Sequence, residues 1–385
     1  MSTTIAEPTW RDGKRYAWLL GLLVPTLPFL TYGLVELTGL GLLWFFGPIL
    51  VFGILPILDL IVGTDSDNPP DSLIKWLEQD RYYRWCTYAY LPIQYAGLVF
   101  ACWLWSSGTL TLIDSIGLAV SVAMVSGIAI NTAHELGHKR GDLERWLSKI
   151  ALAQSGYGHF FIEHNRGHHV RVATPEDPAS SRLGENFWLF LPRTVAGSLR
   201  SSWELEAVRL DRMGKPHLSI HNDILNAWLM TVVLFAGLTA VFGWVVLPFL
   251  MIQAVIGFSL LEVVNYLEHY GLLRQHREDG RYERCAPEHS WNSNNVASNV
   301  LLYHLQRHSD HHANPMRRYQ ALRHFDEAPQ LPTGYAGMIV IALFPPIWRR
   351  VMDHRVLEHY EGDLSRANVY PRKRARVMAR YGATA

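Results

Sequence analysis

The sequence has 385 residues, of which 49% are hydrophobic and 18% are Asp, Glu, Lys or Arg, and its formal net charge is +1. A charged fraction below the roughly 25% of soluble domains argues against a soluble globule, and the near-zero net charge gives no reason to expect a nucleic-acid partner. Cys86, Cys102 and Cys285 lie far apart, which excludes a four-thiolate iron or zinc cluster within the chain.

Six apolar runs are long enough to cross a hydrocarbon core about 30 Å thick, which needs roughly 20 residues of helix. In chain order they are Tyr16–Leu37, Leu42–Val62, Tyr88–Trp105, Ile113–Ile130, Ile224–Phe242 and Val245–Val264. The prolines within the first two runs are tolerable in helices that pack inside a membrane. The sequence therefore predicts an all-α integral membrane protein with six transmembrane helices.

The distribution of Lys and Arg predicts how these helices are oriented. The links after the first, third and fifth runs contain neither residue, whereas the N-terminal arm and the remaining segments contain nearly all of them. The positive-inside rule then places both termini and both long polar segments in the cytoplasm. We divide the chain into an N-terminal arm with helices one to four (1–138), a first cytoplasmic cap segment (139–223), helices five and six (224–269), and a second cap segment with a basic tail (270–385).

Half of the 18 histidines fall into three close groups and one single position. These are His134 and His138 in NTAHELGHKR, His164, His168 and His169 in FIEHNRGHH, His308, His311 and His312 in LQRHSDHH, and His269 in NYLEHYGL. Residues three or four apart share a helical face, so each group can direct two imidazoles to one place. Adjacent histidines differ by about 100° around a helix, so that neighbours can face two different metals.

Nine imidazoles exceed the three or four protein ligands of a single zinc site, which favours two metal ions. His134 and His269 follow the fourth and sixth predicted spans, and both spans end on the cytoplasmic side, where the other groups also lie. We therefore expect all nine histidines to meet at one membrane face, in a cap of helices and loops. Imidazole suits Fe, Zn, Cu and Ni, so ligand type alone does not identify the metal.

Two other classes of protein fit part of this pattern. HELGH matches the HExxH helix of zinc proteases, with Glu135 as the general base, but that interpretation leaves six of the histidines without a role. A metal transporter should place ionisable residues near the bilayer midplane, whereas these ligands cluster at one edge. We expect a two-metal enzyme without a general acid or base of the hydrolase kind, so no catalytic residue is assigned beyond the metal ligands.

Four further side chains are candidates for orienting the ligands through hydrogen bonds, namely Glu262, Asn265, Asp177 and Asp310. Glu262 and Asn265 share the i, i+3, i+7 face of His269, and an ionisable group inside a span is a functional candidate. Glu262 could instead pair with a polar neighbour, and the two aspartates could be helix caps or surface charges.

The motifs HELGHKR, EHNRGHH and LQRHSDHH resemble the three histidine boxes of the integral-membrane di-iron desaturase and hydroxylase superfamily. NYLEHYGL at 265–272 narrows the resemblance to the membrane alkane 1-monooxygenases, and the similarity also covers NPPD at 68–71 and LPTGY at 331–335. The resemblance implies a non-haem di-iron enzyme of the bacterial inner membrane that uses O₂ and two electrons to convert medium- or long-chain n-alkanes into primary alcohols. The implied iron ligands are His134, His138, His164, His168, His169, His269, His308, His311 and His312.

The resemblance also implies rubredoxin as the electron donor, reduced in turn by an NAD(P)H-dependent rubredoxin reductase. The chain lacks the four rubredoxin cysteines, so the donor must be a separate protein or a region outside this sequence. A fatty-acyl desaturase or an aryl-methyl hydroxylase would use much the same iron chemistry, and NYLEHYGL favours the alkane hydroxylase.

Two further features have more than one interpretation. Val51, Ile54 and Leu58 follow i, i+3, i+7 spacing on the second span and could line a substrate channel between lipid-embedded helices, or could simply pack against lipid or another helix. The tail contains Arg372, Lys373, Arg374 and Arg376, which fit a solvated or headgroup-facing segment or a docking surface for an acidic partner.

Overall fold

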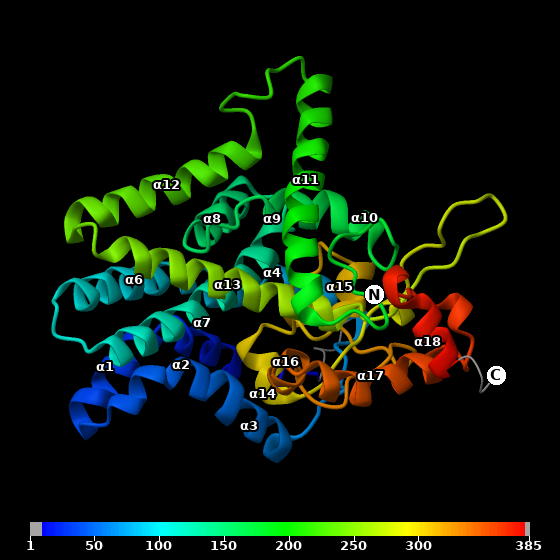
Figure 1. The fold of residues 1–385 in the computed structure, drawn as a ribbon, viewed down its shortest axis with the longest axis horizontal. Coiled ribbons are helices and arrows are strands. Elements are labelled where there is room, and N and C mark those ends of the chain that lie inside the picture. The colour runs from blue at the N-terminus through cyan, green and yellow to red at the C-terminus, as the bar shows by residue number, and fades with distance from the viewer. Residues whose placement is uncertain (1–9, 382–385) are drawn as a thin grey trace, which may run out of the picture.

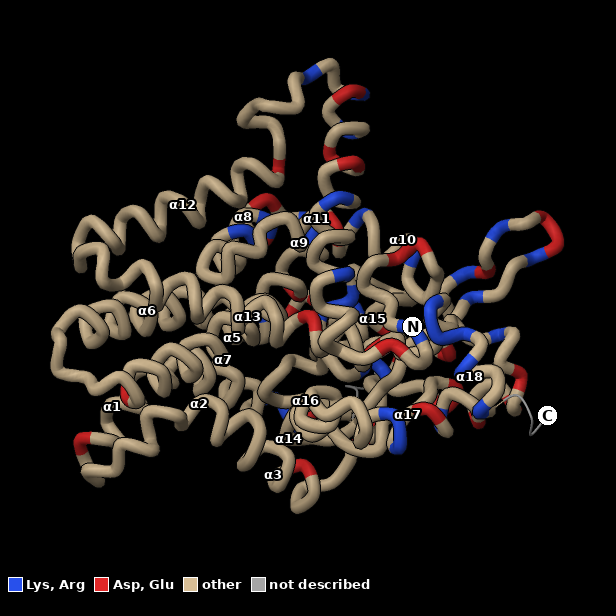
Figure 2. The backbone as a smooth tube through the Cα atoms, viewed as in Figure 1, with Lys and Arg blue, Asp and Glu red and all other residues tan. Residues whose placement is uncertain are grey.

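The architecture is known from a computed structural model that describes residues 10–381. Within these residues the chain forms helices and no β-strand, and only four isolated β-bridges join its loops. Long helices lie side by side in a bundle, and short helices and loops of the second half gather at one end of it (Figure 1). Most charged residues also lie toward that end, whereas α6, α7, α12 and α13 carry few (Figure 2).

Four helical stretches in residues 10–381 are long and apolar enough to cross a membrane, namely Gly41–Val62, α7 (Leu112–Gly137), α12 (Asp223–Phe242) and α13 (Val246–Glu268). A 3₁₀ helix at Ala17–Leu23 and α1 (Leu27–Thr38) would together make a fifth. The third predicted span is α6 (Tyr90–Ser106), whose 17 residues extend about 26 Å, less than the hydrocarbon thickness. The prediction of six spans is therefore supported for four, or for five with the bent pair.

The first predicted span is broken rather than straight. Its two helical parts meet at an angle of 71°, at the segment that contains Pro25. Proline has no N–H group to donate to a preceding carbonyl, and its ring clashes with the preceding helical turn. Pro28 lies in the first turn of α1, where the missing donor costs nothing. Two prolines close together thus end one helix and begin the next.

The contact between α7 and α13 forms the centre of the bundle. Almost every residue of α7 from Gly117 to Leu136 is buried. A Cβ atom on Gly127 would lie 2.8 Å from the carbonyl oxygen of Gly257, and one on Gly257 would lie 2.6 Å from Ser126 Oγ. The two glycines therefore allow the helix backbones to approach closely, as small residues do between membrane helices.

Replacing Gly127 by leucine is expected to lower the free energy of unfolding by about 1–3 kcal/mol, because the new side chain must displace the α13 backbone. The melting temperature in detergent would measure this effect. Gly237→Leu is the matched control, since a Cβ atom at Gly237 on α12 meets nothing within 4 Å. Equal melting temperatures for Gly127→Leu and wild type would contradict the close helix contact.

The remaining helices include the two parts of the second apolar stretch, α2 and α3, and the helices of the more polar segments. They are α2 (Phe46–Ile49), α3 (Leu55–Val62), α4 (Asp71–Gln79), α5 (Arg81–Tyr88), α8 (Asp142–Ala153), α9 (Phe160–Ile162), α10 (His169–Arg171), α11 (Phe187–Arg212), α14 (Val296–Leu301), α15 (His308–Ala313), α16 (Tyr335–Leu343), α17 (Pro345–His359) and α18 (Arg374–Tyr381). Helix α11 runs across the direction of α12 and α13 and projects from the bundle (Figure 1).

Candidate metal centre

The nine histidines of the four sequence motifs converge into two sets. The first, called the five-histidine group, contains His134, His138, His164, His169 and His311. The second, called the four-histidine group, contains His168, His269, His308 and His312. Within each group, one ring nitrogen from every member lies within 4.8 Å of the others. The structure therefore brings together all nine histidines singled out in the sequence, and it divides them between two places.

Local helix geometry decides which group each histidine joins. His134 lies in the last turn of α7 and His138 directly follows that helix. Residues Glu163–His168 form a π-helical turn, in which residues five apart rather than four apart share a side. His164 and His169 consequently face the same group, with their Nε2 atoms 3.0 Å apart, and His168 faces the other.

The third histidine motif is divided in the same way by α15. The neighbours His311 and His312 point to different groups because successive residues are rotated by about 100° around a helix. His308, one turn earlier, joins His312, and their Nε2 atoms lie 2.9 Å apart. His269, at the end of α13, completes this group with its Nε2 atom 3.2 Å from that of His308.

The ring nitrogens are arranged as metal ligands rather than as hydrogen-bonded pairs. In the five-histidine group, Nε2 of His311 lies 2.8 Å from Nε2 of His134 and 3.1 Å from Nε2 of His169. One proton per neutral ring cannot satisfy such a chain of contacts, whereas an ion about 2.1 Å from each nitrogen can. The buried Nε2 atoms of His138 and His168 have no hydrogen-bond partner within residues 10–381. The donor set therefore fits two metal ions.

Burial keeps these imidazoles neutral. The surrounding protein lowers the pKa values of six ligands outside the membrane-spanning segments, and neighbouring histidines lower them further. These are His138, His164, His169, His308, His311 and His312. A neutral imidazole offers the lone pair that a metal needs, so the burial prepares the site for binding.

Two members of the four-histidine group, His168 and His269, are oriented by a hydrogen bond from Nδ1, and a third, His308, has a carboxyl oxygen near its Nδ1 without forming a hydrogen bond to it. His168 donates to Asp177 Oδ2 at 2.9 Å, and His308 Nδ1 lies 3.3 Å from Glu268 Oε1. His269 donates to the backbone carbonyl of His289 at 3.1 Å. Such outer contacts fix the tautomer, so that Nε2 faces the metal.

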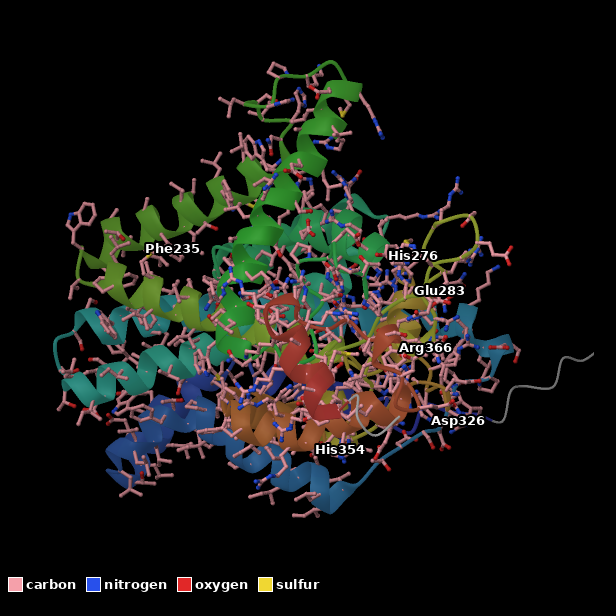
Figure 3. The ribbon with its side chains drawn as sticks, turned by 45° about the vertical axis from the view of Figure 1, so that its right-hand side comes forward. Phe235, His276, Glu283, Asp326, His354 and Arg366 are labelled. Carbon is pink, nitrogen blue, oxygen red and sulfur yellow. The ribbon has the colours of Figure 1, made fainter. Side chains whose placement is uncertain are left out.

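Asp177 and His289 are themselves held in place. Burial raises the pKa of Asp177, but the electrostatic interaction with the His168 ring and the hydrogen bonds from His168 and Ser180 outweigh it and lower the pKa to about 2. Asp177 is therefore an anion beside the group. His289 contacts Glu283, which lies at the base of a projecting hairpin, with a nitrogen–oxygen distance of 3.1 Å (Figure 3).

The five-histidine group has no comparable outer contacts. Within residues 10–381, no ring nitrogen of its members donates to a carboxylate or to a backbone carbonyl. Glu135, the base of the zinc-protease interpretation, instead forms a buried ion pair with Lys139 at 3.1 Å. The two groups thus differ in their surroundings as well as in their number of ligands.

The other predicted outer-shell residues contact different partners. Glu262 accepts hydrogen bonds from Tyr157 (2.7 Å), Thr194 (2.9 Å) and Asn265 (3.2 Å), which form a polar cluster of their own. Asp310 accepts from Arg317 Nη1 at 2.6 Å, from Asn314 Nδ2 at 2.8 Å and from the backbone N–H of Arg323 at 2.8 Å. Only Asp177 of the four contacts a histidine ring of the site.

Glu268 and the carbonyl of His289 were not singled out in the sequence. Glu268 directly precedes His269, yet the histidine that it contacts, His308, comes from a distant segment. No local spacing relates the two residues. The only available signal was an ionisable residue at the end of an apolar run.

A narrow apolar cavity of about 50 Å³ lies between the helices and reaches chain positions three residues before two of the histidines, His134 and His308. Its lining residues come from the second apolar stretch, α7, α13, α14 and α16, and they include Val51, Leu55, Asn131, Leu260 and Ile339. Asn131 lies one helical turn before His134, and Leu305 of the same lining lies three residues before His308. One end of the cavity therefore borders both ligand-bearing segments.

The predicted channel face is rotated relative to this cavity. Val51 lines it, but Ile54 and Leu58 do not, and Leu58 is 37% exposed. Residues Leu50–Ile54 form a π-helical turn, which widens the repeat so that Leu55, rather than Ile54, follows Val51 on the inner side. Of the three predicted channel residues, the structure places Val51 alone at the cavity.

Comparison with known proteins agrees with the site. The sequence profile of the fatty acid desaturase family matches residues 114–342. The chain is 49% identical to an alkane 1-monooxygenase from Acinetobacter baylyi, over 97% of this chain and 92% of the relative. It is 47% identical to alkane 1-monooxygenase 1 from Alcanivorax borkumensis (96% and 92%), and 46% identical to the alkane 1-monooxygenase of Pseudomonas putida (98% and 94%). The chain therefore belongs to the fatty acid desaturase family and, within it, to the membrane-bound alkane 1-monooxygenases.

Proposed function

We propose that this enzyme converts the terminal methyl group of medium- or long-chain n-alkanes into a primary alcohol at a di-iron centre. The reaction consumes one alkane, one O₂, two electrons and two protons, and it yields one alcohol and one water. The nine histidines would hold the two iron ions, which supply the activation of O₂ when bound. One observation carries this proposal. Two buried histidine groups lie at the ends of segments whose preceding residues, Asn131 and Leu305, line an apolar cavity.

The chain's own residues bind and aim the substrate. An alkane offers no polar group, so its recognition depends on burial, at about 0.8 kcal/mol per CH₂. Aliphatic side chains such as Val51, Leu55 and Leu260 supply that surface. They also exclude water from the reacting methyl group. Asn131 is the one polar residue in this lining, and its side-chain amide donates a 2.7 Å hydrogen bond to the carbonyl of Leu302. The substrate would therefore meet an apolar wall up to the ligand-bearing ends of α7 and α15.

We further propose that the enzyme lies in the bacterial inner membrane with both termini and the metal-bearing end in the cytoplasm. The Lys- and Arg-free links between spans support this orientation. Rubredoxin, reduced by an NAD(P)H-dependent reductase, is the proposed electron donor. The donor would be a separate protein or a region outside these 385 residues, because the three cysteines of the sequence are free and dispersed.

Metal analysis and turnover on one purified preparation test the function. We expect two irons per chain, and conversion of octane to 1-octanol that depends on O₂, rubredoxin, rubredoxin reductase and NADH. An acyl thioester serves as the competing substrate, because a desaturase would introduce a double bond into it. A preparation with two irons that desaturates the thioester and leaves octane unchanged would overturn the proposal.

Val51→Trp is expected to shorten the preferred alkane, because the indole would fill part of the cavity that Val51 lines. Each CH₂ that no longer fits loses about 0.8 kcal/mol of binding, close to a fourfold change in kcat/KM per carbon for the excluded lengths. Product yields across a series from hexane to hexadecane would measure the shift.

Leu58→Trp provides the control for this substitution. It adds the same side chain to the same helical stretch at a site outside the cavity lining, where Leu58 is 37% exposed. We expect its chain-length profile to match that of the wild type. Identical profiles for both variants would remove Val51 from the substrate path.

A further inference from the structure

A cluster of cations lies on α18, the last helix of the described chain, and on the residues directly before it. Arg372, Arg374 and Arg376 are exposed, and none of them forms an ion pair with an acidic residue in the described part of the chain. Arg349 of α17 and Lys373 belong to the same cluster. The pKa of Lys373 is lowered by partial burial and by the charges of Arg349 and Arg376. Glu185 and Asp353 offset part of the positive charge around Lys373, whereas the exposed Arg372, Arg374 and Arg376 have no ion-pair partner in the described part of the chain.

The inner side of α18 is fixed to the protein. Val377 is buried against Gly184, where a Cβ atom would lie 2.9 Å from Val377 Cγ2. Gly184 has a φ of 85°, so glycine serves both the backbone conformation and the close approach. Tyr381 at the end of α18 donates to Asp353 Oδ2 at 2.9 Å. The cationic surface is therefore a rigid feature of the fold rather than a loose tail.

A short buried connection leads from α18 to the four-histidine group. Asp353 accepts a second hydrogen bond, at 2.9 Å, from the hydroxyl of Tyr270, which is fully buried. Tyr270 is the chain neighbour of His269, a member of the group. The same hydroxyl accepts the backbone N–H of Gly184 at 2.9 Å. Two tyrosines and one aspartate thus join the cationic helix to a proposed iron ligand.

We propose that α18 is the docking surface for an acidic one-electron carrier protein that reduces the metal centre. The inference rests on the proposed function, because it assigns a place on this chain to the external electron donor. Charge complementarity steers such a carrier to the cluster. A carrier docked there would lie at the outer end of the Tyr381–Asp353–Tyr270 connection. A short distance between the carrier and the metal centre matters because electron transfer slows steeply with distance.

Membrane lipid fits this helix less well than a soluble carrier does. A helix that lies on a bilayer buries an apolar face in it, but Val377 of α18 packs inward and Met378 is half-buried against the core. The helix also lies against α17, past the ends of α7 and α13 and opposite the α6–α7 turn (Figures 1 and 3). Its exposed side chains are arginines and the small Ala375 and Ala379, and no large apolar side chain is exposed on it.

The test is the double charge reversal Arg374→Glu with Arg376→Glu in the full-length, iron-loaded enzyme. We expect the Kd for a bacterial rubredoxin of acidic surface, measured by titration calorimetry in nanodiscs, to rise about tenfold or more. The salt dependence of binding should weaken at the same time. The iron content and kcat at saturating rubredoxin should stay within twofold of the wild type, because the substitutions lie outside the site.

The matched control reverses two other exposed cations, Arg212→Glu with Lys215→Glu, at the projecting end of α11. An unchanged Kd in the α18 variant, or an equal rise in both variants, would overturn the inference. So would an unchanged rubredoxin Kd combined with weaker binding of the α18 variant to anionic vesicles, since that result assigns the helix to lipid headgroups. Failure of the wild type to form 1-octanol would instead count against the proposed function, and binding is measured independently of turnover.

Discussion

His269→Ala is expected to leave about one iron per chain and to abolish octane hydroxylation. His269 belongs to the smaller of the two imidazole groups, so its removal leaves three nitrogen donors where four converged. It also deletes the ring that the carbonyl of His289 holds in orientation. The iron content of the purified variant, measured by mass spectrometry against protein concentration, gives the direct result, and octanol formation gives the functional one.

The control for this variant is His276→Ala. His276 is exposed on the projecting hairpin (Figure 3), and it belongs to neither histidine group. It should retain two irons per chain and full turnover. If His269→Ala also kept two irons and full turnover, the fourth motif would not supply a ligand, and the four-histidine group would have to be reassigned.

Asp177→Asn is expected to weaken the binding of one metal ion by about 10–100-fold while leaving the other unchanged. The amide keeps the shape of the side chain but removes the negative charge that faces His168 Nδ1 at 2.9 Å. Because the pKa of Asp177 is lowered to about 2, this charge is present throughout the physiological pH range. Titration of metal-free protein with Co²⁺, followed by its visible absorption, would resolve the two binding steps.

Glu262→Gln is the matched comparison for Asp177→Asn. It also replaces a buried acidic side chain by its amide, but Glu262 contacts Tyr157, Thr194 and Asn265 rather than a histidine of either group. We expect both Co²⁺ affinities to stay within about threefold of the wild type, together with a lower melting temperature. Equal losses of metal affinity in the two variants would show that buried charge, and not contact with His168, is the relevant property.

The sequence predicts features that depend on local spacing or on chain-long hydropathy. The apolar runs place α7, α12 and α13 correctly, because a continuous apolar segment of this length has few alternatives to a buried or membrane helix. The i, i+3 and i+4 spacings predict that histidines gather, and the adjacent pairs, such as His168 and His169, divide between two groups. These inferences need only the geometry of one helix at a time.

Features that depend on a local departure from helical geometry were not predictable in this way. The π-helical turn at Leu50–Ile54 moves Leu55 to the cavity and Ile54 away from it. The break near Pro25 bends the first span by 71°, although the hydropathy of the run is continuous. A regular period cannot locate an inserted residue or a kink, since both are settled by packing against other helices.

Contacts between distant segments form a third class. Glu268 contacts His308, which lies in another segment, whereas Asp310 contacts Arg317, only seven residues further along the chain, rather than a metal ligand. Both acids lie beside histidines in the sequence, and their roles become distinguishable only when α15 is folded against the end of α13. Position in the sequence can therefore identify acidic residues that are candidates for a metal centre, but only the folded structure shows which of them contact the imidazoles.

The division of the histidines has a consequence for how the protein matures. His134 and His311 approach each other across 177 positions of sequence. A growing polypeptide that ends before His308 possesses four of the five rings of one group and two of the four rings of the other. Neither pocket is complete until the final third of the chain has been synthesised and folded back. The two proposed iron ions would therefore be fully ligated only after this segment has folded, and each ion would then link α15 to earlier segments of the chain.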